Sequence, residues 1–179
     1  SQQPKIVDTG NVVIENGKPS LSFDGTDDVL RSDFGKGTAN QKSLFYVSNL
    51  DVSGSDAQGT VIDDYDDNNT EYNTFGRGLD QYKFFDDKIG SISPYDNRQM
   101  LVSATMDNNG NYSGYIDSNL KYQSQKDVGY NGISIGAIRI RSTAYYSKST
   151  IQEIVYYLSN QQQNRELIEK NINNYYGIY

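Results

Sequence analysis

The chain contains no cysteine, no histidine and no tryptophan among its 179 residues. It therefore has no disulfides, no thiolate nucleophile, no zinc site of the Cys/His kind and no catalytic triad built on an imidazole base. Prolines are scarce, occurring only at Pro4, Pro19 and Pro94, and no apolar run approaches the length of a membrane-spanning helix. We therefore expect no membrane insertion and no imidazole- or thiol-dependent chemistry.

Basic residues are missing from one long stretch. Between Ser43 and Gly76 there is no Lys or Arg, whereas seven acidic residues fall there. The whole chain has 23 acidic and 16 basic residues, so this stretch accounts for the entire net charge of −7. A surface that binds nucleic acid needs basic side chains, so we do not expect nucleic acid as a partner. A cation or a neutral polyhydroxylated ligand fits this charge better.

Alternation of apolar and polar residues, with polar turns about every ten residues, indicates antiparallel β-structure. The strand-like segments are residues 21–23, 44–47, 60–65, 72–75, 81–85, 100–106, 112–117, 133–137 and 151–157. The segment 44–47 is continuously apolar, which is typical of a strand covered on both faces. Asn109-Gly110 predicts a hairpin between the strands at 100–106 and 112–117.

Only the C-terminal end has helical spacing. Ser159 and Gln162 form a capping-box pattern, and Gly177 stands where a helix would end. We predict one domain over residues 1–179, an all-β antiparallel sandwich of two sheets. It has an entry segment at 1–19 and a C-terminal helix at 159–176.

The order of several motifs resembles a known family. The segment from Gly17 to Leu30 contains Leu-Ser-Phe-Asp-Gly-Thr-Asp-Asp-Val-Leu and is similar to the first strand of laminin-G-like, concanavalin A-like jelly rolls. The hairpin around Asp-Asn-Asn-Gly, the Ile-Ser-Ile-Gly-Ala segment and the closing Tyr-Tyr-Gly-Ile resemble that family's later strands and terminal helix. The variant that begins Gln3-Pro4-Lys5-Ile6 is most similar to modules of bacterial surface proteins and bacteriophage virion or tail proteins.

This resemblance implies a jelly roll whose loops and concave sheet bind glycans or host surface molecules, often without catalysis. It also implies an extracellular, cell-surface or virion location within a larger parent protein. The same fold hosts glycoside hydrolases, which need paired carboxylates. The family's Glu-x-Asp-x-x-Glu string is absent. Asp64 and Asp66 have the alternate spacing but lack a third acid in register, so we predict that the domain is not an enzyme.

The acidic stretch contains a candidate calcium loop. Asp64, Asp66 and Asn68 occupy alternate positions, as oxygen ligands do around Ca²⁺. Asn69 replaces the usual turn glycine and no bidentate glutamate follows, so a solvated hairpin turn is the competing interpretation. A second acidic group, Asp24, Asp27 and Asp28, lies in the first turn of the family pattern, and we favour a structural role for it.

Tyrosines outside the strand interiors are the other candidate site. An exposed tyrosine offers a ring for the C–H face of a sugar and a hydroxyl for its edge. The candidate ligand-binding residues are Tyr65, Tyr72, Arg77, Tyr82, Tyr95, Tyr145 and Tyr146. Arg139 and Arg141 form a concentrated positive charge that pairs with the acidic stretch or with an anionic sugar.

The sequence thus predicts a non-catalytic module that binds carbohydrate or a cell-surface receptor, with calcium as the one expected cofactor. The main alternative is a structural capping or oligomerisation domain of a fibre or virion, which would make the parent a homo-oligomer. A glycan-degrading enzyme with an atypical site is the third reading.

Overall fold

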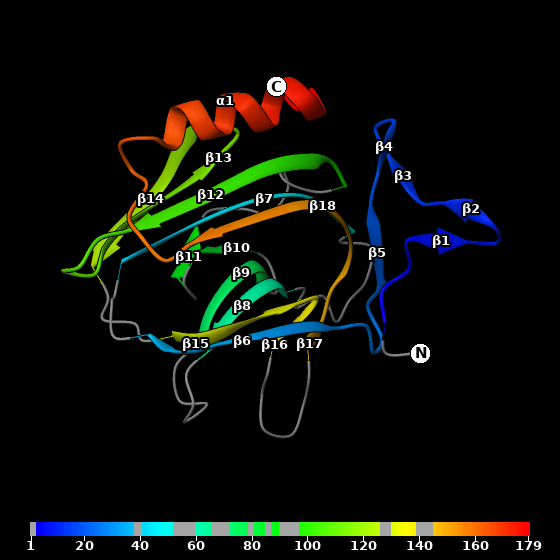
Figure 1. Ribbon diagram of the computed structural model, residues 1–179, viewed down its shortest axis with the longest axis horizontal. Helices are drawn as coiled ribbons and strands as arrows, with labels where there is room; N and C mark the ends of the chain where they lie inside the picture. Colours follow the sequence, from blue (N-terminus) through cyan, green and yellow to red (C-terminus); the bar gives the residue numbers. More distant parts are fainter. Residues whose placement is uncertain are drawn as a thin grey trace.

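The computed structural model describes residues 3–37, 41–51, 60–65, 72–78, 81–84, 87–89, 97–125, 130–138 and 145–179. These residues form two six-stranded antiparallel sheets packed face to face, with a helix on the outer side of one of them (Figure 1). The predicted all-β sandwich with a C-terminal helix is confirmed. No helix in the described part of the chain is long and apolar enough to span a bilayer.

The sheet under the helix is called the helix-side sheet. Its order is β14 (Asn119–Gln125), β13 (Asn111–Ile116), β12 (Gln99–Met106), β7 (Lys42–Leu50), β18 (Lys148–Tyr157) and β5 (Leu21–Asp24). The opposite sheet runs β11 (Asp87–Ile89), β10 (Gln81–Phe84), β9 (Tyr72–Gly78), β8 (Thr60–Tyr65), β15 (Tyr130–Ile135) and β6 (Leu30–Gly37). Neighbours far apart in sequence, such as β7 and β18, explain why local patterns predict the strands but not their order.

Strand β7 lies between two hydrophobic clusters, which explains its unbroken apolar run. Leu44 and Tyr46 belong to the core between the sheets, together with Phe75 and Phe84 of the opposite sheet. Phe45 and Val47 point the other way and pack beneath the helix. Because successive strand residues alternate between faces, a strand covered on both sides needs apolar residues at every position.

Helix α1 (Arg165–Tyr176) is shorter than predicted, since it begins at Arg165 rather than at 159. Asn164 is its N-cap residue, and residues 161–164 form turns. The predicted capping box does not form: Ser159 Oγ accepts a hydrogen bond from Gln161 Nε2 at 2.7 Å. The predicted C-terminus is correct, because Gly177 adopts φ 64° and its N–H donates to the Asn173 carbonyl.

The predicted strand at 133–137 is divided by a close contact. Strand β15 ends at Ile135, and the short β16 (Ala137–Ile138) follows and pairs with β17 (Tyr145–Tyr146). Between them Gly136 has φ 85°, and a Cβ atom there would lie 2.3 Å from the ring of Phe23. Only glycine meets both demands, so the chain turns here toward the second pairing.

An N-terminal arm projects from the side of the sandwich, beside β5 (Figure 1). It consists of two small hairpins, β1 (Val7–Asp8) with β2 (Asn11–Val12) and β3 (Ile14–Glu15) with β4 (Lys18–Pro19). The second hairpin is tied to the sheet by Glu15, whose carboxylate accepts from Asn49 Nδ2 at 3.0 Å and Thr150 Oγ1 at 3.2 Å. The arm is therefore anchored at its base.

Candidate functional site

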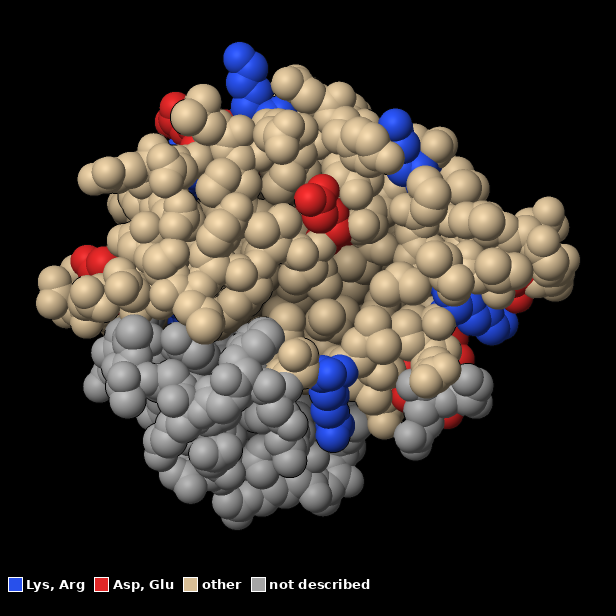
Figure 2. Space-filling view, viewed as in Figure 1, with Lys and Arg blue, Asp and Glu red and all other residues tan. Residues whose placement is uncertain are grey.

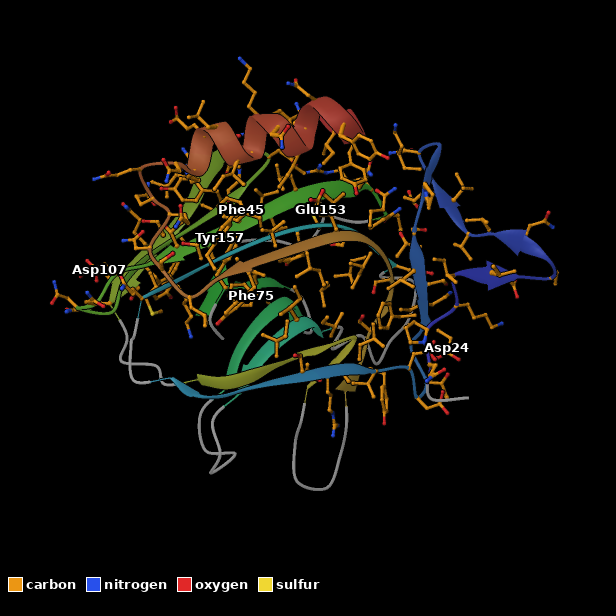
Figure 3. The ribbon with its side chains drawn as sticks, in the orientation of Figure 1. Asp24, Phe45, Phe75, Asp107, Glu153 and Tyr157 are labelled. Atoms are coloured by element: carbon orange, nitrogen blue, oxygen red, sulfur yellow. The ribbon has the colours of Figure 1, made fainter. Side chains whose placement is uncertain are left out.

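A polar groove lies on the outer face of the helix-side sheet, between the β12–β13 hairpin and the segment that precedes α1. We call it the hairpin groove. Its volume is about 490 Å³, and its lining includes Thr105, Asp107, Asn111, Ser113, Gln123, Asn160 and Gln162. Figure 3 shows Asp107 at the hairpin end of the molecule, on the opposite side from Asp24.

The floor of the groove is a row of polar residues across three strands. Thr105 of β12 is paired in register with Ser113 of β13, which is paired with Gln123 of β14. Directly opposed residues of antiparallel strands lie side by side on one face. Gln123 Nε2 donates to Ser113 Oγ at 3.0 Å, which holds the amide along the row.

The hairpin wall is built around Asp107. Its Oδ1 accepts from the backbone N–H groups of Asn109 at 2.8 Å and Asn111 at 2.9 Å, while Oδ2 accepts from Asn111 Nδ2 at 2.8 Å. The Asn111 side chain contributes most to lowering the pKa of Asp107 below its usual 3.8, with the two backbone donors adding to the effect. The carboxylate thus remains ionised and oriented at the groove.

The opposite wall is the segment before α1, and Gln162 fastens it to the sheet. Gln162 Nε2 donates to the Tyr115 hydroxyl at 2.9 Å, and its Oε1 accepts from the Thr105 hydroxyl. Asn160 Oδ1 accepts from the Gln162 backbone N–H at 2.8 Å. Gln162 does not cap the helix because its side chain is hydrogen-bonded to Thr105 and Tyr115 of the sheet.

The groove offers amides, hydroxyls and one carboxylate on a flat base. Such groups hydrogen-bond neighbouring hydroxyls of a saccharide, which presents each hydroxyl as donor and acceptor. None of the lining residues in the described part of the chain is Lys or Arg. In the view of Figure 2 most of the described surface is uncharged, and acidic and basic side chains lie next to each other toward its right-hand edge.

Four of the seven predicted ligand-binding residues lie on the opposite sheet. Tyr65 is paired in register with Tyr72 across β8 and β9, and Arg77 is paired with Tyr82 across β9 and β10. The backbone register thus brings four of the seven candidates into two cross-strand pairs. Tyr145 and Tyr146 form β17, opposite Ile138 and Ala137.

Some of the remaining predicted residues are outside the part of the chain that the structure describes. These are Asp66, Asn68, Tyr95, Arg139 and Arg141. Asp64 is on β8, paired in register with Asn73 of β9 and Ile133 of β15. The calcium loop at Asp64, Asp66 and Asn68 therefore stays a prediction.

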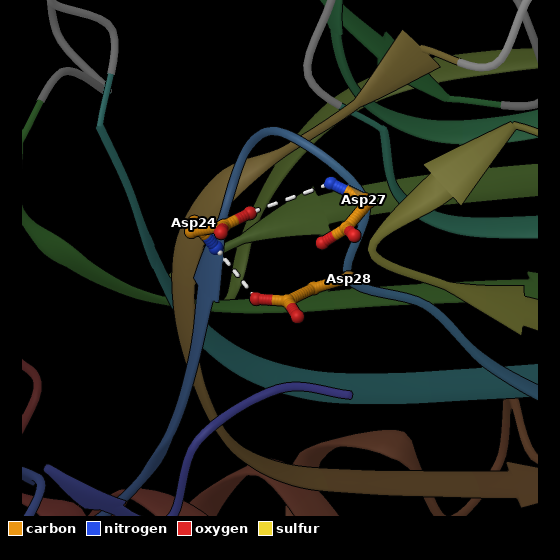
Figure 4. Close-up of side chains that lie close together, drawn as sticks. All are labelled: Asp24, Asp27 and Asp28. Atoms are coloured by element: carbon orange, nitrogen blue, oxygen red, sulfur yellow. Dashed lines mark hydrogen bonds between the residues drawn. The ribbon is translucent and has the colours of Figure 1, made fainter. Parts of the chain in front are cut away.

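The acidic group in the first turn has the contacts of a turn (Figure 4). Asp28 is buried and its Oδ2 accepts from the Asp24 backbone N–H at 2.9 Å, while Asp24 Oδ1 accepts from Thr26 N at 2.7 Å. Oxygens of Asp24, Asp27 and Asp28 lie within 4.8 Å of one another. Side chains that cap nearby backbone N–H groups stabilise a tight turn, as predicted.

A smaller hollow lies between the C-terminal end of α1 and β18, and the sequence did not predict it. Glu153, Asn171, Tyr175 and Tyr176 line it. The helical spacing placed both tyrosines on the packing face, yet Tyr175 is 58 % exposed, with Lys18 Nζ 4.1 Å from its ring centre. Burial and the nearby Glu153 carboxylate raise the pKa of Tyr176 to about 12.

No protein-family model and no curated protein matches the chain at the level of sequence. Solved structures do share its fold. The receptor-binding domain of botulinum neurotoxin C/D mosaic serotype has a TM-score of 0.60 at 13 % identity, over 94 % of this chain and 45 % of that one. The ligand-binding domain of botulinum neurotoxin serotype D, in complex with N-acetylneuraminic acid, has a TM-score of 0.59 at 14 % identity, over 92 % of this chain and 49 % of that one.

A Trypanosoma rangeli sialidase is also similar, with a TM-score of 0.53 at 14 % identity, over 79 % of this chain and 25 % of that one. This chain thus spans less than half the length of each of these three proteins. At such low identity the likeness establishes a shared β-sandwich fold and leaves function to the chemistry of the surface.

Proposed function

We propose that this chain is a non-catalytic recognition domain that binds a carbohydrate, or a glycosylated cell-surface receptor, in the hairpin groove. The observation that carries the proposal is the pair of accessible polar side chains Ser113 and Gln123 beside the Asp107 carboxylate, on a row completed by the buried Thr105. Hydroxyl and amide groups both donate and accept hydrogen bonds, as the hydroxyls of a saccharide do. The fold shared with toxin receptor-binding domains supports this class of function.

The groove is poorly suited to glycoside hydrolysis. Glycosidases use two carboxyl groups, and the one that acts as general acid has a raised pKa. Among the described residues that line the groove only Asp107 is acidic, and its pKa is lowered. We therefore propose binding without turnover.

We also propose the parent protein, the calcium site and the tyrosine surface that the sequence predicts. A larger extracellular or virion parent of the laminin-G-like kind would present several copies, and multivalency would then raise a weak single-site affinity. Calcium at Asp64, Asp66 and Asn68 would order the opposite sheet's loops. The second contact surface we propose consists of Tyr65, Tyr72, Arg77, Tyr82, Tyr95, Tyr145 and Tyr146.

A glycan array probed with the tetramerised chain, with and without EDTA, tests the proposal. We expect binding that Gln123→Ala weakens and that Gln3→Ala leaves unchanged, since Gln3 is an exposed residue of the N-terminal segment. Loss of binding with EDTA would support the calcium site. Binding that Gln123→Ala does not alter but Tyr65→Ala or Tyr72→Ala abolishes would move the site to the opposite sheet, and no binding on any array would overturn carbohydrate recognition.

One observation favours the alternative of an assembly domain. The N-terminal arm exposes four apolar side chains, each about half accessible: Ile6, Val7, Val12 and Ile14. An apolar surface of this kind is typical of a contact with another protein chain. Light scattering on the wild type and on a Val7→Ser, Val12→Ser variant would decide, because only an arm-mediated oligomer loses mass in the variant.

A further inference from the structure

The hairpin groove has a single ionised group among its described lining residues, and it is negative. Asp107 supplies that charge, and none of the described residues that line the groove is Lys or Arg. Lys121 is exposed on β14 but lies where the pairing with β13 shifts register, and it is not part of the lining. The described lining of the groove therefore has no cation that would pair with an acidic ligand.

Asp107 also retains room for a ligand. An ionised carboxylate accepts about four hydrogen bonds, and the hairpin supplies three of them. The remaining position needs a donor, which a sugar hydroxyl or the N–H of an acetamido group provides. A charge-assisted bond of this kind is shorter and stronger than one between neutral groups.

The negative charge of Asp107 disfavours acidic saccharides. A carboxylate or sulfate placed among Asp107, Asn111 and Gln123 would lie close to a like charge, and like charges a few ångströms apart near a protein surface repel appreciably. Strong recognition of such groups uses the forked donors of arginine, which the described lining lacks. The groove thus opposes an anionic ligand electrostatically, and its described lining has amide donors but no guanidinium to compensate.

We infer that the hairpin groove selects neutral, hydroxyl-rich saccharides and rejects sialylated, uronic and sulfated ones. This inference rests on the proposed function and specifies its ligand class. It separates this chain from the similar serotype D toxin domain, whose bound N-acetylneuraminic acid is a carboxylated sugar. The charge at Asp107 is the residue-level determinant of this selectivity.

The test compares matched neutral and acidic ligands on the intact chain. Lactose and sialyllactose form one pair, and oligogalactose and oligogalacturonate form another. Binding is followed by the ¹H–¹⁵N shifts of Asp107, Asn111 and Gln123. We expect the neutral member of at least one pair to shift these signals. The acidic member should bind with an affinity about tenfold lower, or lower still, because of the repulsion between like charges a few ångströms apart.

Asp107→Asn should reduce the ratio of the dissociation constants of the acidic and the neutral ligand. The substitution removes the charge, while Asn Oδ1 still accepts hydrogen bonds from the backbone N–H groups of the turn. Asp8→Asn is the matched control, since it removes one charge from the exposed arm. Acidic ligands that bind as tightly as neutral ones, or a ratio unchanged in Asp107→Asn, would overturn the selectivity while leaving saccharide binding intact. If no ligand of either kind shifts the groove signals, the proposed function fails with it.

Discussion

Glu169 of α1 is completely buried and forms an ion pair with Arg165, one turn earlier in the same helix. The Glu169 carboxylate also accepts from the Ser103 hydroxyl of β12 and from the Ser118 hydroxyl at 2.7 Å. The Arg165 guanidinium lies 3.9 Å from the ring centre of Tyr115. Helix and sheet are therefore joined by a charged network as well as by apolar packing.

Removing Glu169 should destabilise the protein strongly. Glu169→Ala leaves the buried Arg165 charge without its buried partner, which costs about 3 to 5 kcal/mol. The control is Glu166→Ala, which removes an 85 % exposed carboxylate paired with the same arginine and should cost less than about 1 kcal/mol. Urea unfolding of both variants measures the difference. Equal losses would mean that the buried network does not hold the helix to the sheet.

Gly136 should tolerate no side chain. In Gly136→Ala the new Cβ would meet Phe23 at 2.3 Å while the residue keeps φ 85°, so overpacking of about 1 to 3 kcal/mol adds to the backbone strain. Gly17→Ala separates the two effects, because Gly17 has φ 74° but nothing within 4 Å. Thermal melts should show the larger loss for Gly136→Ala. Similar melting temperatures would indicate that Phe23 moves aside freely.

Tyr176 should titrate unusually late. Burial first, and the Glu153 and Tyr175 charges second, raise its pKa from 10 to about 12. A raised folded-state pKa stabilises the fold fully below pH 10, and this contribution is lost as pH rises toward 12. The difference in ultraviolet phenolate absorbance between wild type and Tyr176→Phe isolates this group. A transition near 10 would show that water reaches the hydroxyl.

The Asp107 carboxyl should stay ionised in mild acid. Because the Asn111 side chain holds its pKa below 3.8, its contribution to stability is present above that pH and is lost as pH falls through the lowered value. Asn111→Ala should return the pKa toward 3.8, as measured by the ¹³C shift of the carboxyl carbon. Saccharide binding that weakens already near pH 5 would argue against a role for the ionised form.

Local patterns predicted much of the fold. The alternation at residues 100–106 and the turn chemistry of Asp107 to Gly110 correspond to β12 and the hairpin after it. The capping-box pattern places the start of α1 too early, because the Gln162 side chain bonds to Thr105 and Tyr115, which are distant in sequence. Helical spacing places Tyr175 on the packing face although it is exposed, because the spacing does not show which other segments lie beside the last turn of the helix.

The candidate groove was not predictable in the same way. Its residues are ordinary polar side chains. In the sequence only the Asp-Asn-Asn-Gly-Asn turn, which begins at Asp107, indicates an exposed hairpin at this position. Thr105, Ser113 and Gln123 become neighbours only through the register of three strands. The tyrosine and calcium predictions concern a different part of the sandwich and stay predictions.

By itself the amino-acid sequence determined the periodicity of the strands, the turn between β12 and β13, and an acidic surface without cysteine or histidine chemistry. Those properties depend on neighbours a few residues apart. Only the tertiary structure decided which polar side chains share one surface and where the helix covers the sheet. Strand register and helix docking depend on contacts between distant segments, and the folded chain settles these contacts cooperatively.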